Sequence, residues 1–437
     1  MIRVIASALL SLALALPARA EIDIQTVVSP SGITAWLYEE HSLPILNLAA
    51  SFQGGAALDP PGQEGVMSMM AALLGEGAGE LDATAFAEAG ERIAAYMGIS
   101  ASRDSVDLWA QSLTENRNQA AELLRSALVE PRFDAEAVER VRQQMLSNAR
   151  SAETDPEAIA GRTFFADAFP DHPYARPTDG TVESLAGLDL AALRTARERA
   201  LTRDRLRVAV VGDITAVELG PLLDRVFGNL PASGPALPPV AVPETPGTVR
   251  VVDFAIPQSI VLFGQAGIAR NDPDFIPAVV MDHILGGGGF GSRLMTEVRD
   301  KRGLTYGIGT WLDPGDFGWL YMGSFSSANA RAAEALAIVR AEWQRMAEEG
   351  ATAVELDAAK RSLTGAYPLR FDGNGRIAGE LLGQQVARLD TGYVNERNSL
   401  VDAVTREDVA RVAKRLLHPA ALTVVVVGQP EGLEAAR

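Results

Sequence analysis

The sequence contains no cysteine in 437 residues and only four histidines. The absence of cysteine excludes disulfide bonds, thiolate metal sites and cysteine nucleophiles. The histidines are His41, His172, His283 and His418, and no two of them lie at the spacing of a metal-ligand pair. We therefore do not expect this chain to hold a metal ion with its own histidines.

Positive charge is also scarce. Lys and Arg number 39 against 56 Asp and Glu, which gives a formal net charge of −17. A strongly acidic surface is repelled by nucleic-acid phosphates and by anionic lipid headgroups. We therefore expect no nucleic-acid partner and no anionic membrane surface as a partner. Hydrophobic residues make up 47% of the chain, which is enough for a well-formed core.

Long apolar runs are missing after the first twenty residues, MIRVIASALLSLALALPARA. This start has a basic residue, an apolar run and an Ala-Arg-Ala ending, which predict a signal peptide over residues 1–20, cut after Ala20. The alternative is an uncleaved anchor, but the run from Val4 to Leu16 is short for crossing ~30 Å of hydrocarbon. We expect an exported protein, periplasmic or secreted, with no integral membrane segment after cleavage.

The rest of the chain divides into two halves. Residues 231–248, PASGPALPPVAVPETPGT, are rich in proline without periodicity, and they predict a linker between domains 21–230 and 249–437. Each half runs strand, helix, strand, two helices and a final apolar strand, LRVAVVG at 206–212 and LTVVVVG at 422–428. This pattern indicates an internal duplication and the α+β class, in which each half has a mixed sheet with helices on one face.

The stretch Gly286–Tyr306, GGGGFGSRLMTEVRDKRGLTY, begins with four glycines in a row. Consecutive glycines are used where the backbone turns sharply or where another chain approaches closely. The loop leads into a short helical pattern that presents Arg299 and Tyr306. Arg offers a planar fork of donors and Tyr a phenolic hydroxyl, so both suit a peptide carbonyl or carboxylate. We interpret four glycines as a substrate-binding loop: Gly286, Gly287, Gly288 and Gly289.

The strings SRL, EVR and RGLTY within this stretch resemble the second-domain signature of the inverzincin peptidases, the family of pitrilysin, insulinase and the mitochondrial processing peptidase. The resemblance covers residues 21–437. It implies two homologous α/β-sandwich halves, each with a mixed, mostly antiparallel sheet, that enclose a chamber together with a partner. It also implies that Arg299 holds the substrate and that Tyr306 steadies the transition state.

The zinc motif of that family, His-x-x-Glu-His, is missing from this chain. Aligned on Gly65 of the apolar stretch QEGVMSMMAALLGEGAG, its three defining positions fall on Ser68, Ala71 and Ala72. The family's third zinc ligand, a glutamate, falls near residues 147–148, which are Ser and Asn. Zinc needs three protein ligands with N, O or S donors. We therefore expect no metal in this chain and a zinc ion in a partner chain.

The resemblance thus implies a non-catalytic subunit of an exported heterodimeric zinc metalloendopeptidase. Arg299 and Tyr306 would act in trans as catalytic groups, in the site of a homologous zinc-bearing subunit. A peptide substrate would lie along the glycine loop and along an edge strand that ends in Gly54 and Gly55.

Two alternatives remain open. An inactive peptide-binding or scaffold protein explains the missing zinc motif equally well, but it explains the retained Arg–Tyr pair poorly. A zinc peptidase with unusual ligands would need donors that the motif helix lacks.

Overall fold

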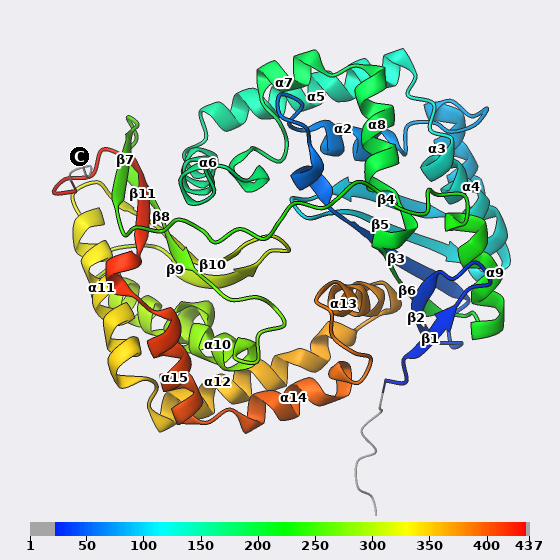
Figure 1. The fold of residues 1–437 in the computed structure, drawn as a ribbon. Helices are drawn as coiled ribbons and strands as arrows, with labels where there is room; N and C mark the ends of the chain where they lie inside the picture. Colours follow the sequence, from blue (N-terminus) through cyan, green and yellow to red (C-terminus); the bar gives the residue numbers. More distant parts are fainter. Residues whose placement is uncertain (1–21, 434–437) are drawn as a thin grey trace, which may run out of the picture.

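The computed structural model describes residues 22–433 and shows two halves of similar construction (Figure 1). The predicted signal peptide and its cleavage site lie outside the described residues. Each half is built around one sheet on which helices pack. This arrangement confirms the predicted α+β class with two α/β-sandwich halves.

The first sheet has six strands in the order β1-β2-β6-β3-β5-β4. They are β1 (Gln25–Val28), β2 (Thr34–Glu39), β3 (Ile45–Gln53), β4 (Tyr96–Ala101), β5 (Ser105–Leu113) and β6 (Leu206–Gly212). All neighbouring strands are antiparallel except β2 and β6, which run parallel. The sheet is therefore mixed and mostly antiparallel, with β1 and β4 at its edges.

The second sheet has five strands in the order β7-β11-β8-β10-β9. They are β7 (Val249–Asp253), β8 (Gln258–Ala266), β9 (Ile308–Pro314), β10 (Trp319–Ala328) and β11 (Thr423–Gly428). The parallel pair is β7 and β11, and the other pairs are antiparallel. This order repeats β2-β6-β3-β5-β4 of the first sheet strand by strand, which confirms the predicted duplication. Residues 231–248 between the halves contain no helix or strand.

One face of each sheet packs against helices of its own half and forms the main core there. The first half contains α2 (Val66–Leu73), α3 (Ala83–Arg92), α4 (Arg117–Val129), α5 (Ala135–Glu153), α6 (Pro156–Ala168), α7 (Val182–Gly187), α8 (Leu190–Ala200) and α9 (Ala216–Phe227). The second half contains α10 (Phe275–Asp282), α11 (Ala332–Glu349), α12 (Ala353–Ala366), α13 (Asn374–Val386), α14 (Tyr393–Ala403) and α15 (Arg406–Leu416). Within residues 22–433, no helix is both long and apolar enough to span a bilayer.

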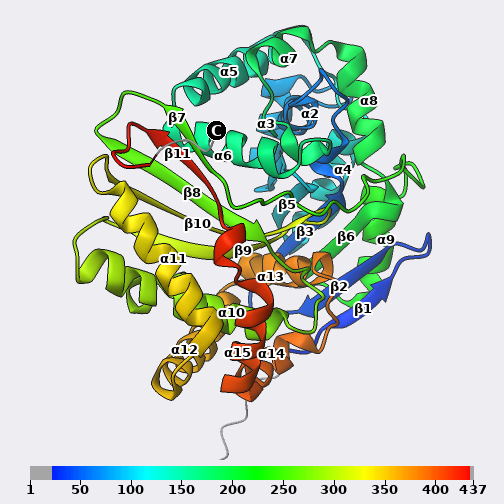
Figure 2. The ribbon, with the colours of Figure 1, turned by 60° about the vertical axis from the view of Figure 1, so that its left-hand side comes forward.

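The other face of each sheet is covered by a helix from the opposite half. Helix α6 of the first half packs Phe164 against Leu262 of β8 and Val425 of β11. Helix α13 of the second half packs Leu381 against Val211 of β6. Figures 1 and 2 show both helices lying against the sheet of the other half. The central strands β6 and β11 are buried on both faces for this reason, which accounts for their continuous apolar runs.

A capping residue and a proline separate α6 from the preceding helix α5. The Asp155 side chain accepts a hydrogen bond from the backbone N–H of Ala158 at 2.7 Å, and Pro156 occupies the first turn. An Asp cap followed by proline is a strong start signal for a helix. Helix α5 therefore ends at Glu153, and the chain turns so that α6 reaches the second sheet. Full burial of a side chain such as Phe164 contributes about 1.5–3 kcal/mol to this docking.

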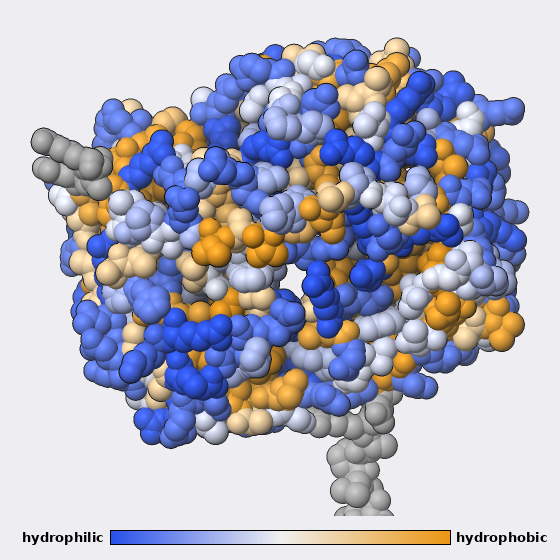
Figure 3. Space-filling view, viewed as in Figure 1, coloured by the Kyte–Doolittle hydropathy of each residue, from blue (hydrophilic) through white to orange (hydrophobic). Residues whose placement is uncertain are grey.

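The halves also touch where two hairpin turns meet. Gln53 donates a hydrogen bond to the carboxylate of Asp316 at 2.7 Å, and the backbone N–H of Asp316 donates to Asp104 at 3.1 Å. Figure 3 shows that an opening remains between the two halves. The halves are thus joined at separate points, with open space between them.

Candidate functional site

The glycine-rich stretch forms a tight turn between two π-helical segments. Helix α10 continues into the π-helical η5 (His283–Gly287), the 3₁₀ turn η6 (Gly289–Gly291) follows, and η7 (Met295–Asp300) is π-helical again. The backbone N–H of Lys301 donates to the carbonyl of Thr296 at 3.0 Å, which is the i to i−5 bond of a π-helix. π-helical turns are rare in proteins, and those that occur are often found at functional sites. The predicted short helix is present, but its turns are wider than those of an α-helix.

Close packing at two positions and backbone conformation at a third explain why the loop needs glycine. A Cβ at Gly286 would overlap the side chain of Thr310, and a Cβ at Gly287 would overlap the carboxylate of Asp282. Gly289 has a φ of 60°, a conformation that L side chains disfavour. The loop backbone therefore rests directly on the end of α10 and on strand β9.

Asp282 lies beneath the loop and accepts a hydrogen bond from the Thr310 hydroxyl at 2.6 Å. Burial raises the pKa of Asp282 to about 6, although hydrogen bonds from Thr310 and Tyr321 oppose the shift. The glycine loop thus rests on a carboxyl group whose charge changes in the mildly acidic range.

Arg299 lies within cation–π distance of two exposed aromatic rings. Its Cζ atom is 4.8 Å from the ring centre of Phe290 and 5.8 Å from that of Tyr306. Tyr306 is 89% exposed and Phe290 is 70% exposed. Nη1 of Arg299 also donates to the Asp300 carboxylate at 3.0 Å. The structure thus brings Arg299 and Tyr306 together, and it adds Phe290 from the glycine loop to the group.

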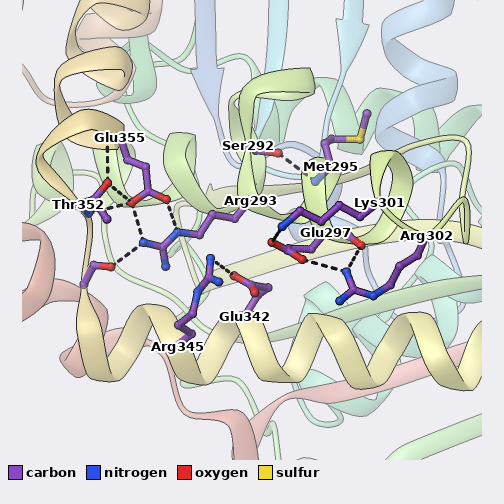
Figure 4. A network of polar contacts seen from close by, with 11 residues as sticks. Ser292, Arg293, Met295, Glu297, Lys301, Arg302, Glu342, Arg345, Thr352 and Glu355 are labelled. Carbon is purple, nitrogen blue, oxygen red and sulfur yellow. Dashed lines mark hydrogen bonds and ion pairs between the residues drawn. The ribbon is translucent and has the colours of Figure 1, made fainter.

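Arg293 of the SRL string anchors the segment that carries this group (Figure 4). Its side chain is buried, and it donates to both carboxylate oxygens of Glu355 at 2.6 and 2.8 Å and to the carbonyl of Gly350 at 2.8 Å. Burial would raise the pKa of Glu355, but the hydrogen bonds from Arg293 and Thr352 lower it to about 2. This two-point ion pair fixes η7 to the start of α12.

Glu297 of the EVR string lies within η7 and pairs with two basic residues that follow this segment (Figure 4). Its carboxylate accepts from Lys301 at 2.7 Å and from Arg302 at 2.9 Å. Both contacts lower the pKa of Glu297. Arg293 therefore ties the start of the segment to α12, and Glu297 links η7 to the turn that follows it.

The helix at the zinc-motif position, α2, is part of the core of the first half. The carboxylate of Asp59 caps its start by accepting from the N–H groups of Gly65 at 2.8 Å and Met67 at 3.1 Å. Met69 and Met70 are fully buried. The helix is therefore held by apolar packing and a capping carboxylate.

The residues at the motif positions do not fit a zinc ion. The Ser68 hydroxyl donates to the carbonyl of Thr178 at 3.1 Å, Ala71 is buried and Ala72 is exposed. Residues 147–148 are exposed on α5 and carry no carboxylate. Within residues 22–433, no group of three or more His, Asp or Glu side chains is arranged to hold a metal ion.

The prediction of an edge strand that ends in Gly54 and Gly55 is wrong. These glycines follow β3, which lies inside the sheet between β6 and β5. Gly54 donates to the carbonyl of Asp104 at 2.6 Å, and a Cβ at Gly55 would overlap the backbone of Ser102 and Ser105. The two glycines shape an internal turn, and a peptide cannot pair with β3, because both of its sides are already paired.

Two residues of the site were not identified from the sequence. The sequence around Phe290 could have indicated an exposed binding residue, since a large apolar side chain between glycines has little to pack against locally. Arg293 stood inside the SRL string, but its partner Glu355 is far away in the chain, and only the fold brings the two together.

Two protein-family models match the chain. The model described as Insulinase (Peptidase family M16) matches residues 37–182, and the model described as Peptidase M16 inactive domain matches residues 187–363. Together the matches cover more than half of the chain and reach into both of its halves.

Individual proteins show the same similarity. A non-peptidase homolog, YmxG, of Helicobacter pylori is 29% identical over 336 residues, which cover 76% of this chain and 78% of the relative. The β subunit of the mitochondrial-processing peptidase of Blastocladiella emersonii is 24% identical over 417 residues, 92% of this chain and 88% of the relative. The crystal structure of a peptidase M16 inactive domain from Pseudomonas fluorescens superposes with a TM-score of 0.87 at 29% identity, covering 95% of this chain and 100% of that chain.

Proposed function

The chain belongs to the peptidase M16 (insulinase) family as a non-catalytic member, and from this premise we propose that it is the zinc-less subunit of an exported two-chain peptidase. In this role it pairs with a homologous subunit that carries the zinc motif. Arg299 and Tyr306 then complete the partner's site, and an unfolded peptide is the substrate.

One observation supports this role above the others. Phe290, Arg299 and Tyr306 form an exposed group on a firmly anchored segment, although the motif helix of the same chain has no zinc donors. A large exposed aromatic surface is unfavourable in water unless a partner or ligand covers it. An isolated scaffold has no need for a cation and a phenol presented together in this way.

The chemistry of the two residues fits this role. The guanidinium of Arg299 can hold a peptide carbonyl through several N–H donors, and its aromatic neighbours restrict its position. The Tyr306 hydroxyl can donate to an oxygen that gains negative charge as the peptide bond is attacked. A donor aimed at developing charge is typically worth about 10²–10³ in rate. The carbonyl contact would act mainly on substrate binding, and the phenol contact on the rate of reaction.

The relatives support a two-chain arrangement. The similarity to a processing-peptidase β subunit extends over nearly the whole chain, and that protein is by its name one subunit of a larger enzyme. The similarity to YmxG, named a non-peptidase homolog, agrees with the missing zinc donors.

The test is to mix the purified protein with the zinc-motif homologue of the same organism and to measure cleavage of an unfolded peptide. Zinc content is measured on each chain and on the mixture. We expect activity only in the mixture, with kcat reduced about 100-fold by Tyr306→Phe and kcat/KM reduced by Arg299→Ala. Matched controls are Tyr96→Phe and Arg361→Ala, which alter exposed side chains away from the group.

The alternatives predict other results. Saturable peptide binding without cleavage in any mixture would favour the peptide-binding or scaffold role. Stoichiometric zinc and activity in this chain alone would overturn the proposal. Size-exclusion chromatography of each variant mixture separates a lost complex from a lost catalytic contact.

A further inference from the structure

A cavity lies in the C-terminal half, between α10, α13 and α14. It encloses about 330 Å³, and three of its lining residues are arginines, Arg270, Arg370 and Arg397. One carboxylate, Glu380, also lines it, at 3.4 Å from Arg370. The lining therefore carries an excess of positive charge in a protein whose net charge is −17.

Two of the arginines have no acidic partner. Within residues 22–433, no carboxylate lies within ion-pair distance of Arg270 or Arg397. Arg270 donates to the Tyr393 hydroxyl at 3.0 Å and stacks at 4.3 Å from the ring centre of Phe275. Arg397 is only 9% exposed, and Nη1 donates to the carbonyl of Leu363 at 2.7 Å. Arg270 is half-buried, whereas Arg397 is a buried cation without a paired carboxylate. Such a cation is costly, so an anion is expected beside it.

Burial lowers the pKa of Arg397 and neighbouring Arg370 acts in the same direction, although Tyr393, Tyr367 and Glu380 oppose the shift. A bound carboxylate would oppose it further. The charge of the arginines, their fixed positions and their aromatic supports together suit a planar carboxylate.

Gln384 also lines the cavity and is 3% exposed. Its Nε2 atom lies 3.3 Å from the Tyr367 hydroxyl and 3.4 Å from Glu380. Its Oε1 atom is fully buried and does not face the open space. Gln384 is therefore part of the supporting wall and offers no contact to a ligand.

The remaining wall is apolar. It is formed by Phe275, Ile276 and Val279 of α10 and by Ala387 and Leu389 after α13. A cavity of this size with an apolar wall and a few polar groups has the general character of a small-molecule site. The ligand therefore combines a carboxylate with an apolar side chain.

We propose that this cavity binds the C-terminal residue of a short peptide, with the carboxylate on Arg270 and Arg397 and the side chain on the apolar wall. A free apolar amino acid offers the same carboxylate and the same side chain. This site is separate from the Arg299–Tyr306 group and does not depend on the proposed subunit role, since its test needs no partner chain.

The test is isothermal titration calorimetry of the purified protein with four probes: alanyl-leucine, the C-terminal amide of alanyl-leucine, free leucine and inorganic phosphate. We expect saturable binding of alanyl-leucine and binding of the amide that is weaker by roughly tenfold or more, because the amide has lost the charged group. Arg270→Gln should weaken the binding of alanyl-leucine by a similar factor. Arg361→Gln on α12 is the matched control, since it removes one exposed positive charge and leaves the cavity intact.

Each result has a defined meaning. Tighter binding of leucine than of the dipeptide would support the site and identify the free amino acid as its ligand. Equal binding of the acid and the amide, tighter binding of phosphate, or unchanged affinity in Arg270→Gln would overturn the proposal. Absence of saturable binding by all four probes would also overturn it. Circular dichroism of each variant shows whether the fold is retained.

Discussion

Gly287 lies so close to Asp282 that a Cβ at position 287 would overlap the carboxylate. Asp282 in turn accepts a hydrogen bond from Thr310 of the edge strand β9. The glycine loop, the end of α10 and β9 are therefore packed as one unit. This unit sets the position of Phe290, and through η7 that of Arg299.

Gly287→Ala should therefore destabilise the protein by about 1–3 kcal/mol, because the loop must move away from Asp282. Urea unfolding followed by circular dichroism measures this change. Gly291→Ala is the matched control, since a Cβ there meets nothing within 4 Å. Equal stability of the two variants would show that the loop is not packed on Asp282.

Asp282 should make stability depend on pH. Its pKa is raised by burial to about 6, above its ordinary value near 3.9, so the folded state binds this proton more tightly than the unfolded state does. Its contribution to stability is full below about pH 4 and is lost as the pH rises to about 6. Asp282→Asn should flatten this part of the curve of unfolding free energy against pH. A variant curve parallel to that of the wild type would contradict the shifted pKa.

Arg293→Met should destabilise the protein strongly. It leaves the Glu355 carboxylate without its two-point partner and the Gly350 carbonyl without a donor, and removal of one member of a buried ion pair costs about 3–5 kcal/mol. The partial exposure of Glu355 favours the lower end of this range. Thermal and urea unfolding measure the effect, and Arg361→Met, which breaks an exposed pair on α12, should have little effect. Similar losses in both variants would rule out an anchoring role for Arg293.

Leu381→Ala should loosen α13 from the first sheet. Leu381 is fully buried against Val211 and Trp36, and a large-to-small change at such a site costs about 2–5 kcal/mol. Hydrogen exchange should increase first in α13, where Gln385 donates to the carbonyl of Val208 at 2.7 Å. Leu369→Ala, at a 69% exposed position, is the control. Uniform exchange changes across the whole chain would indicate global unfolding and not a separate docking step.

Phe290→Ala should weaken substrate binding by the proposed two-chain enzyme. Removal of the ring takes away one support of Arg299, and an exposed cation–π contact is worth about 0.5–1 kcal/mol. We expect a two- to fivefold rise in KM with little change in kcat. Steady-state kinetics of the mixed subunits measure both constants. A large fall in kcat with unchanged KM would mean that Phe290 acts on the reaction step.

Several features could be predicted from local sequence. The runs 206–212 and 422–428 indicated buried strands, because continuous β-branched segments are typical of strands covered on both faces. Arg299 and Tyr306 are seven residues apart, so a short turn suffices to bring them together. The strand position of Gly54 and Gly55 was predicted wrongly, because alternation shows that a segment is a strand but does not show its neighbours in the sheet.

The sequence by itself determined the repeated order of strands and helices, the lack of zinc donors at Ser68, Ala71 and Ala72, and the closeness of Arg299 to Tyr306. The order of elements and the closeness of Arg299 to Tyr306 follow from periodicity and a short separation along the chain, and the zinc-motif positions follow from the family resemblance. Only the tertiary structure decided that α6 and α13 cover each other's sheets, that β3 lies inside its sheet, and that Arg270, Gln384 and Arg397 line one cavity. Apolar periodicity in the sequence shows which face of a helix is buried. The surface against which that face packs depends on contacts between segments that are far apart in the chain.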